Sequence, residues 1–286
     1  MSILEQLNSR QREAASCTDS HVRIIAGAGS GKTRVVTVRI AYLIDECHVY
    51  PNRILAITFT NKAAREMRER VESMLGPLAA SVRISTIHSF CVRLLREDIQ
   101  SIGYPRNFTI LDSEDQKSIL KDIYKEKEID AKSQPYGGML GYISSCKTTF
   151  VDPSQASQLA HSESQKEKAR VYASYEARLR DMFALDFDDL LIRAYELLKE
   201  KADIREKWQR RFDYIHVDEF QDVDELQYGI IRLLCAPDTK LCVVGDPDQT
   251  IYTWRGANVD IIMNFERDFK GCKTVILDEN YRSEAH

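Results

Sequence analysis

The stretch that decides the fold of this chain is Ala26-Gly27-Ala28-Gly29-Ser30-Gly31-Lys32-Thr33. It follows an apolar run that starts at Val22 and precedes a helical pattern, which is the order of strand, loop and helix that a phosphate-binding P-loop requires. Small residues allow backbone N–H groups to turn toward phosphate oxygens at the positive end of a helix dipole. Lys32 can reach the terminal phosphates, and the Thr33 hydroxyl can bind Mg²⁺. A Gly/Ser turn followed by a chance Lys-Thr is the alternative, and so full a match favours a nucleoside triphosphate site.

Composition sets limits on the class of protein. The chain has 286 residues, 43% hydrophobic and 29% charged, enough for more than one domain and a sizeable core. A net charge of −4 argues against nucleic-acid binding through a broad basic field, although local basic patches remain possible. The 7 cysteines form no Cys-x-x-Cys pair, which predicts reduced thiols rather than disulfides or zinc. Without a secretory signal pattern or a bilayer-length apolar run, we expect a cytoplasmic protein with no membrane partner.

Short apolar, β-branched runs separated by helical stretches predict an α/β fold with a parallel sheet covered on both faces. The expected strands are 22–26, 53–59, 82–85, 214–217, 241–244 and 273–277. Residues 112–186 differ, because helical patterns at 113–128 and 164–183 flank a glycine-rich break and no strand is expected. We therefore predict an all-α subdomain at 112–186, inserted between the two parts of the α/β domain, 1–111 and 187–280.

Two carboxylates, Asp218 and Glu219, end the expected strand at 214–217. Asp218 fits a Walker B acid that holds Mg²⁺, and Glu219 is then placed to polarise the attacking water. Acids at a strand end are often only caps for the next helix. Their combination with an upstream P-loop favours the catalytic interpretation.

A second loop follows the strand at 241–244. It contains Gln249, a neutral donor and acceptor suited to a γ-phosphate or its water. Tyr252 and Trp254 come next at alternating spacing. Such aromatic rings can stack on unpaired bases or pack in a core, and periodicity alone does not decide between the two.

The ordered set of motifs resembles the N-terminal portion of the UvrD/PcrA/Rep-type superfamily 1 DNA helicases, from about Leu7 to Ser283. Each block by itself is a moderate signal, whereas the ordered set is hard to obtain by chance. In that family's order the blocks are Leu7-Asn8-x-x-Gln11 (Q motif), Ala26–Thr33 (phosphate loop), Thr58–Ala64 (motif Ia), Ser85–Phe90 (motif Ib), Asp186–Leu190, Val217–Asp222 (motif II), Gly245–Ala257 (motif III) and Leu277–Ser283 (motif IV).

The resemblance implies a RecA-like P-loop NTPase that uses ATP and Mg²⁺. It implies that Gln11 binds the adenine edge, that Tyr281 stacks on the adenine, and that Arg282 contacts the terminal phosphates as an arginine finger. The implied catalytic residues are Glu219, Lys32, Gln249 and Arg282, and the implied metal ligands are Thr33 and Asp218. The implied nucleotide-binding residues are Gln11, Ala26, Gly27, Ala28, Gly29, Ser30, Gly31, Lys32, Thr33, Arg34, Tyr281 and Arg282.

The resemblance also implies a track for single-stranded DNA. Its implied residues are Phe59, Asn61, His88, Phe187, Tyr252 and Trp254. Aromatic rings in such a set can stack on unstacked bases, and polar groups can bind phosphates. A core position remains an open alternative for His88 and Phe187.

The activity implied for the whole protein is that of an ATP-dependent DNA helicase. It would act on single-stranded DNA and duplex junctions, with 3′-to-5′ travel and a role in repair or replication. Two alternatives are a translocase that strips proteins from DNA and a regulatory P-loop ATPase without a DNA substrate. Residues 281–286 are expected to begin the hinge to a second motor domain. Alone, the chain is therefore expected to be monomeric, to bind nucleotide weakly and not to unwind DNA.

Overall fold

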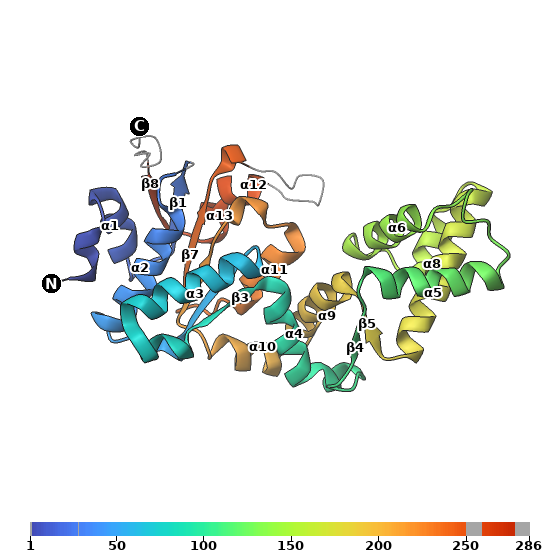
Figure 1. The fold of residues 1–286 in the computed structure, drawn as a ribbon, viewed down its shortest axis with the longest axis horizontal. Helices are drawn as coiled ribbons and strands as arrows, with labels where there is room; N and C mark the ends of the chain where they lie inside the picture. Colours follow the sequence, from blue (N-terminus) through green and yellow to red (C-terminus); the bar gives the residue numbers. More distant parts are fainter. Residues whose placement is uncertain (1, 28, 250–258, 278–286) are drawn as a thin grey trace. The chain divides into compact units, whose positions relative to one another are not determined.

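The computed structural model describes residues 2–27, 29–249 and 259–277 (Figure 1). It divides into two compact units. The first, called the α/β unit here, contains the residues up to Phe90 and those from Leu198 onward, and the second, the helical unit, is Cys91–Leu197. The predicted insertion, 112–186, lies inside the helical unit. The unit is wider because α4 (Ile87–Asp98) and α9 (Phe187–Glu200) are continuous helices that run through its two boundaries.

A six-stranded sheet forms the centre of the α/β unit, with the strand order β3-β2-β6-β7-β1-β8. Every neighbouring pair is parallel, which confirms the predicted fold class and all six expected strands to within a residue or two. The strands are β1 (Val22–Ala26), β2 (Ile54–Thr58), β3 (Arg83–Thr86), β6 (Tyr214–Val217), β7 (Lys240–Gly245) and β8 (Lys273–Leu277). Every residue of β2 is buried, as expected for an apolar strand covered on both faces.

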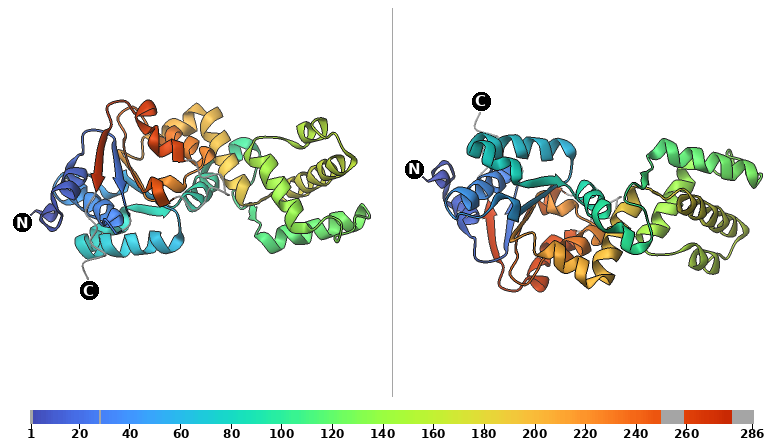
Figure 2. Two further views of the ribbon diagram at one scale, coloured as in Figure 1. Left: turned by 90° about the horizontal axis from the view of Figure 1, so that it is seen from above. Right: turned by 90° about the horizontal axis from the view of Figure 1, so that it is seen from below.

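Helices cover both faces of this sheet. Figure 2 shows α3, in cyan, on one side of the strands and the orange-to-red helices α11, α12 and α13 on the other. The helices of the α/β unit besides α4 and α9 are η1 (Ile3–Gln6), α1 (Ser9–Ser16), α2 (Lys32–Asp45), η2 (Pro51–Arg53), α3 (Asn61–Leu75), η3 (Gly76–Ser81), α10 (Ala202–Gln209), η5 (Phe220–Asp222), α11 (Glu225–Leu234), η6 (Pro247–Gln249), α12 (Val259–Met263) and α13 (Phe265–Asp268).

A buried arginine fixes α1 against α2. Arg39, in α2, is fully buried, and its Nη1 donates hydrogen bonds to the carbonyl oxygens of Ala14 (3.1 Å) and Ala15 (3.2 Å). These carbonyls belong to the last turn of α1, where no intrahelical donor remains for them. The arginine therefore holds α1, which carries Gln11, against the helix that starts at the phosphate loop.

The helical unit has its own hydrophobic core, which includes Leu120, Ile123, Met139 and Tyr175. Its elements are η4 (Ile99–Ile102), β4 (Thr109–Ile110), α5 (Ser113–Glu126), α6 (Tyr136–Thr148), α7 (Pro153–Gln158), α8 (Glu163–Asp181) and β5 (Ala184–Leu185). The helices predicted at 113–128 and 164–183 are confirmed as α5 and α8. The prediction that 112–186 contains no strand is wrong, because β5 pairs in parallel with β4. A two-residue strand is too short to produce a periodic pattern.

No helix in the described part of the chain combines the length and the apolar character that crossing a membrane requires.

Candidate nucleotide and nucleic-acid site

The phosphate loop connects β1 to α2 in a tight curl. Gly29 and Gly31 have φ values of 75° and 82°, in the left-handed region that favours glycine. The Ser30 hydroxyl donates a hydrogen bond to the carbonyl oxygen of Gly27 at 2.7 Å, which closes the curl. The first N–H groups of α2 are therefore presented behind the loop, as anion binding requires. Of the predicted loop residues, Ala28 lies outside the described part of the chain.

The acidic pair predicted to follow β6 lies beside this loop. The Thr33 hydroxyl donates to Asp218 Oδ2 at 3.2 Å, and Lys32 Nζ lies 3.5 Å from Glu219 Oε2. Because β7 lies between β6 and β1 in the sheet, the carboxyl ends of three neighbouring strands meet here. The structure thus brings together four of the residues predicted for catalysis and metal binding.

Asp218 is a buried carboxylate, 4% exposed, that lies beside a second carboxylate. Burial, together with the nearby Glu219 carboxylate, raises the pKa of Asp218 to about 6. The hydroxyl of Thr33 and the Asp218 carboxylate are both oxygen donors, which Mg²⁺ prefers. The oxygen donors predicted as metal ligands, Thr33 and Asp218, therefore lie together, and their chemistry fits Mg²⁺.

Gln11 closes the loop from the side of α1. Its side-chain Nε2 donates to the Ser30 carbonyl at 2.9 Å, and its Oε1 accepts from the backbone N–H of Asn8 at 3.3 Å. The predicted adenine-binding glutamine is thus held directly against the phosphate loop. Arg34 is placed differently, because its Nη2 donates to the carbonyl oxygen of Gln6 at 2.7 Å. In the structure Arg34 thus binds the backbone of η1.

Gln249 is exposed in η6, at the carboxyl end of β7, and its backbone N–H donates to the Asp246 carbonyl at 3.0 Å. Its side chain is therefore exposed at the same sheet edge as the phosphate loop and the acidic pair. Two other residues predicted to bind the nucleotide, Tyr281 and Arg282, lie outside the described residues.

Sequence reasoning missed one polar residue at this edge. Gln221 is 2% exposed, and its amide bonds both the Glu219 carboxylate (2.8 Å) and the backbone N–H of Asp246 (3.0 Å). The signals available in the sequence were its position two residues after Glu219 and its place in the Val217–Asp222 block, and neither assigns it a role. Its partner Asp246 is distant in the sequence, so no local pattern could reveal the contact.

The predicted DNA-binding residues of the α/β unit occupy the same edge, on its other half. Phe59 follows β2, Asn61 begins α3, and His88 lies in the first turn of α4 directly after β3. Asn61 is exposed, whereas Phe59 and His88 are partly buried. Burial lowers the pKa of His88, so its imidazole is neutral near pH 7. None of the three is sealed in the core.

Phe187, at the start of α9 in the helical unit, is 49% exposed, so the core alternative is wrong for this residue. Two further residues predicted to bind DNA, Tyr252 and Trp254, lie outside the described residues.

Comparison with known proteins identifies the family of this chain. A model of the family described as "UvrD/REP helicase N-terminal domain" matches residues 7–270. The chain belongs to this family. It is 50% identical over 281 residues to the ATP-dependent DNA helicase PcrA of Bacillus subtilis (strain 168) and 47% identical over 281 residues to that of Staphylococcus aureus (strain Mu50 / ATCC 700699). Each alignment covers 98% of this chain and 38% of the relative, so the chain spans well under half of their length.

In this UvrD/REP-family chain, a buried charge cluster supports the start of α9. Lys147 Nζ lies 2.7 Å from Glu176, 2.8 Å from Asp186 and 2.9 Å from Asp189. Asp186 and Asp189 cap α9 reciprocally, each accepting the other's backbone N–H at 3.0 Å and 3.2 Å. Phe187 is the residue that follows the first of these caps, so the cluster fixes the backbone on which the exposed ring is mounted.

The three carboxylates share one ammonium. Burial by itself would lower the pKa of Lys147, but Asp189, Asp186 and Glu176 outweigh it and raise that pKa well above its ordinary value. Burial, followed by the Asp186 carboxylate, raises the pKa of Asp189 to about 7. Asp189 therefore takes up a proton more readily than an ordinary aspartate, which relieves the excess negative charge.

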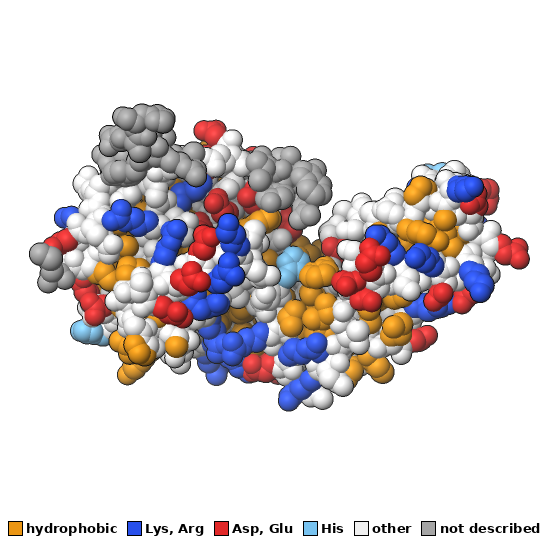
Figure 3. Space-filling model, viewed as in Figure 1, with side chains coloured by type: hydrophobic (Ala, Val, Ile, Leu, Met, Phe, Trp, Pro, Cys, Tyr) orange, Lys and Arg blue, Asp and Glu red, His pale blue; other side chains and the backbone are white. Residues whose placement is uncertain are grey.

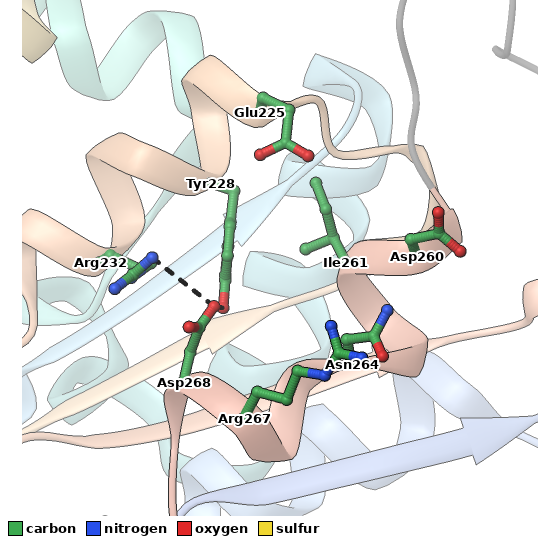
Figure 4. A pocket seen from close by; sticks show the side chains of 8 residues that line it. All are labelled: Glu225, Tyr228, Arg232, Asp260, Ile261, Asn264, Arg267 and Asp268. Carbon is green, nitrogen blue, oxygen red and sulfur yellow. Dashed lines mark hydrogen bonds and ion pairs between the residues drawn. The ribbon is translucent and has the colours of Figure 1, made fainter.

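A separate pocket of about 240 Å³ lies between α11 and the α12–α13 segment of this UvrD/REP-family domain (Figure 4). The Tyr228 hydroxyl donates to Asp268 at 2.6 Å, and Arg232 lies 3.6 Å from the same carboxylate. The residues that line this pocket carry charges of both signs, and none of them is a predicted site residue. The lining residues are Glu225, Tyr228, Arg232, Asp260, Ile261, Asn264, Arg267 and Asp268.

The surface charge is mixed as well. Figure 3 shows Lys and Arg side chains interspersed with Asp and Glu on the face that it views. On α3, Lys62 lies 3.8 Å from Glu66 and Arg65 lies 3.9 Å from Glu69, so neighbouring acids offset these two basic side chains. Exposed pairs of this kind contribute little to stability.

Proposed function

We propose that this chain is the nucleotide-binding motor domain of an ATP-dependent DNA helicase. The whole protein would couple ATP hydrolysis to 3′-to-5′ movement along single-stranded DNA and to separation of duplex strands at junctions, in DNA repair or replication. The relatives at 47% and 50% identity are named ATP-dependent DNA helicase PcrA, which supports this proposal.

One observation carries the proposal. The carboxyl ends of β1, β6 and β7 hold the phosphate loop, the acidic pair and η6, while the ends of β2 and β3 are followed by Phe59, Asn61 and His88. Both groups lie on one edge of one sheet, where open α/β sheets bind ligands. A change in nucleotide occupancy on one half of the edge can therefore shift the residues proposed to bind DNA on the other half.

The proposed chemistry follows from the charges at this edge. Lys32 meets the negative charge on the terminal phosphates, and Glu219 orients and polarises the attacking water. Mg²⁺, held by Thr33 and Asp218, would neutralise charge on the phosphate oxygens. Gln249 would sense the γ-phosphate, Arg282 would act as an arginine finger, and Gln11 and Tyr281 would hold the adenine.

The isolated 286-residue chain is proposed to be monomeric, to bind nucleotide weakly and to leave duplex DNA intact. It spans 38% of the length of its relatives, so further walls of both sites would come from the remainder of the protein.

The test is the ATPase rate of the full-length protein that carries this chain, measured with and without single-stranded DNA. A rate that rises at least about tenfold with single-stranded DNA supports the proposal. A rate that DNA does not change would favour a regulatory ATPase instead. Parallel assays of duplex unwinding and of displacement of a DNA-bound protein separate a helicase from a translocase that only clears proteins.

A further inference from the structure

We propose that Gln221 is a positioning residue that holds the Glu219 carboxylate and ties it to the backbone leading to Gln249. This inference rests on the proposed function, because it takes Glu219 as the group that polarises the attacking water. It adds a residue to which the sequence motifs assign no role. Gln221 would act through its two neighbours and would not touch the reacting atoms.

The amide of Gln221 bridges two segments with defined polarity. Its Nε2 donates to Glu219 Oε2 at 2.8 Å, and its Oε1 accepts from the backbone N–H of Asp246 at 3.0 Å. Because a backbone N–H can only donate, the amide oxygen must face Asp246, and the NH₂ group must face Glu219. Gln221 is 2% exposed, so bulk water does not compete for either bond.

The backbone on both sides is shaped to allow this contact. A Cβ at Gly245 would lie 2.6 Å from Gln221 Oε1 and 3.0 Å from the Gln221 backbone nitrogen, so only glycine leaves room for the amide. Glu219 has φ 50° and ψ 45°, a sparsely populated conformation for a residue with a side chain. Phe220 supports this turn because its fully buried ring packs against Tyr228 and Phe265.

The same carboxylate oxygen of Glu219 receives two donors, Lys32 at 3.5 Å and Gln221 at 2.8 Å. A triphosphate competes for the Lys32 ammonium, and Gln221 then remains as the donor that fixes the carboxylate. At its other end the amide is bonded to Asp246, whose carbonyl accepts the backbone N–H of Gln249 at 3.0 Å. A displacement of the Gln249 turn by the γ-phosphate would therefore be passed to Glu219 through one buried amide.

The test uses three variants of the full-length protein. Gln221→Met keeps the side-chain length and removes every hydrogen bond of the amide, including a longer one of 3.4 Å from Nε2 to Asp222 Oδ2. Gln221→Glu keeps an acceptor for the Asp246 N–H but removes the donor to Glu219. The matched control is Gln209→Met. Gln209 is the last residue of α10, away from the nucleotide site, and its amide donates a hydrogen bond of 2.9 Å to the carbonyl oxygen of Leu233 in α11.

We expect both Gln221 variants to lower the kcat of ATP hydrolysis by about 10- to 100-fold, the size of effect that misplacing a catalytic group produces. The affinity for a fluorescent ADP analogue should stay within about threefold of wild type, because Gln221 is not proposed to touch the nucleotide. Gln209→Met should leave both quantities near their wild-type values. If Gln221→Met fails to fold, Gln221→Glu replaces it, both in the wild-type protein and in the Glu219→Gln background described next.

A double-mutant cycle separates positioning from a general structural role. In a Glu219→Gln background, Gln221→Met should change the residual single-turnover rate by less than about twofold, because its target carboxylate has already been removed. A kcat within about twofold of wild type in both Gln221 variants overturns the inference. The inference is also overturned if Gln221→Met lowers kcat, ADP affinity and the thermal midpoint together, and by equal amounts in the wild-type and the Glu219→Gln backgrounds.

The two proposals fail in different ways. A wild-type ATPase that ignores DNA, combined with the expected losses in the Gln221 variants, overturns the DNA motor and leaves Gln221 as a positioning residue. A DNA-stimulated ATPase that tolerates both substitutions supports the DNA motor and overturns the positioning role of Gln221. A wild-type protein without ATPase activity overturns both.

Discussion

The ammonium nitrogen of Lys32 lies 3.5 Å from carboxylate oxygen Oε2 of Glu219. The two side chains come from the two segments of the α/β unit, one before and one after the helical unit, and they meet because β1 and β6 lie on either side of β7. Lys32 is the more buried partner, with 11% of its side chain exposed against 36% for Glu219. A triphosphate must therefore compete with Glu219 for this ammonium.

Because Lys32 and Glu219 are paired, substitutions of the two residues should change nucleotide affinity in opposite directions. Glu219→Gln removes the competitor for Lys32, so we expect nucleotide affinity to be retained or increased while turnover falls by at least about 100-fold. Lys32→Met should weaken nucleotide binding as well as turnover. Equilibrium binding of a fluorescent ATP analogue and single-turnover hydrolysis measure the two effects. The control is Lys117→Met, which removes an exposed ion pair with Glu114. Normal single-turnover hydrolysis by Glu219→Gln would remove Glu219 from the catalytic role.

A methyl group at position 245 should disturb the same site from the other side. Gly245→Ala places a Cβ 2.6 Å from Gln221 Oε1 and 2.8 Å from Ile262 Cδ1, so the Gln221 amide must move. We expect a destabilisation of about 1–3 kcal/mol, typical of overpacking, together with a lower kcat. Gly138→Ala in α6 is the control, because nothing lies within 4 Å of its new Cβ. Urea unfolding and ATPase rates test this, and an unchanged kcat in Gly245→Ala would contradict it.

Removing the ammonium at position 147 should weaken the helical unit strongly. Lys147→Met leaves the Glu176, Asp186 and Asp189 carboxylates without their shared cation, and the Lys147 side chain is only 3% exposed. The expected loss is about 3–5 kcal/mol, the range for breaking a buried ion pair. Lys166→Met removes an exposed pair with Glu163 and should cost at most about 1 kcal/mol. Urea unfolding followed by circular dichroism compares the two, and equal losses would count against the buried cluster.

Asp189 gives the helical unit a pH dependence of a definite sign. Its folded-state pKa is raised to about 7, so it favours folding at low pH, and this contribution is lost as the pH rises through about 7. Asp189→Asn should therefore lose less stability than wild type between about pH 5 and about pH 8.

The control for this pH effect is Asp112→Asn, at the exposed cap of α5. Backbone hydrogen bonds from Asp115 and Glu114 lower the pKa of Asp112, so its contribution is lost only at acidic pH. Asp112→Asn should leave the change between about pH 5 and about pH 8 as in wild type. Urea unfolding at the two pH values measures both variants, and a wild-type slope in Asp189→Asn would refute the assignment.

The exposed ring of Phe187 should matter for DNA and little for folding. With 49% of the residue exposed, Phe187→Ala removes little buried apolar area, whereas a lost stacking platform weakens single-stranded DNA binding by about 1–3 kcal/mol. Tyr50→Ala is a matched control, because Tyr50 is 76% exposed and precedes the amino end of β2, away from the proposed track. Fluorescence anisotropy with a labelled oligonucleotide tests both, and equal affinities would exclude Phe187 from the track.

Local sequence signals were sufficient for the sheet and for one wall of the nucleotide site. Each strand is a short apolar run flanked by polar or turn residues. The phosphate loop needs positive φ at two positions, and the sequence has glycine at both, Gly29 and Gly31. Asp218 and Glu219 follow directly from the strand that carries them. These features depend on neighbours in sequence, so they could be predicted without coordinates.

Other features depend on partners that are distant in the chain. The bond between Gln221 and Asp246 joins two loops, and the cluster around Lys147 joins α6, α8 and the cap of α9. The limits of the helical unit lie inside two continuous helices, where composition does not change. A sequence pattern contains no signal for contacts of these kinds.

The order of strands has a consequence for synthesis on the ribosome. β1, which leads into the phosphate loop, has β7 and β8 as its only neighbours among the described strands, and Val22 is aligned with Cys242 and Lys273. Both neighbours are translated after the whole helical unit, Cys91–Leu197, which can acquire its own core first. Until then the nascent β1 has no strand to pair with, and such late, distant pairings fold slowly. The nucleotide site is therefore among the last parts of this molecule to assemble, and its first strand stays without a pairing partner while the helical unit is synthesised.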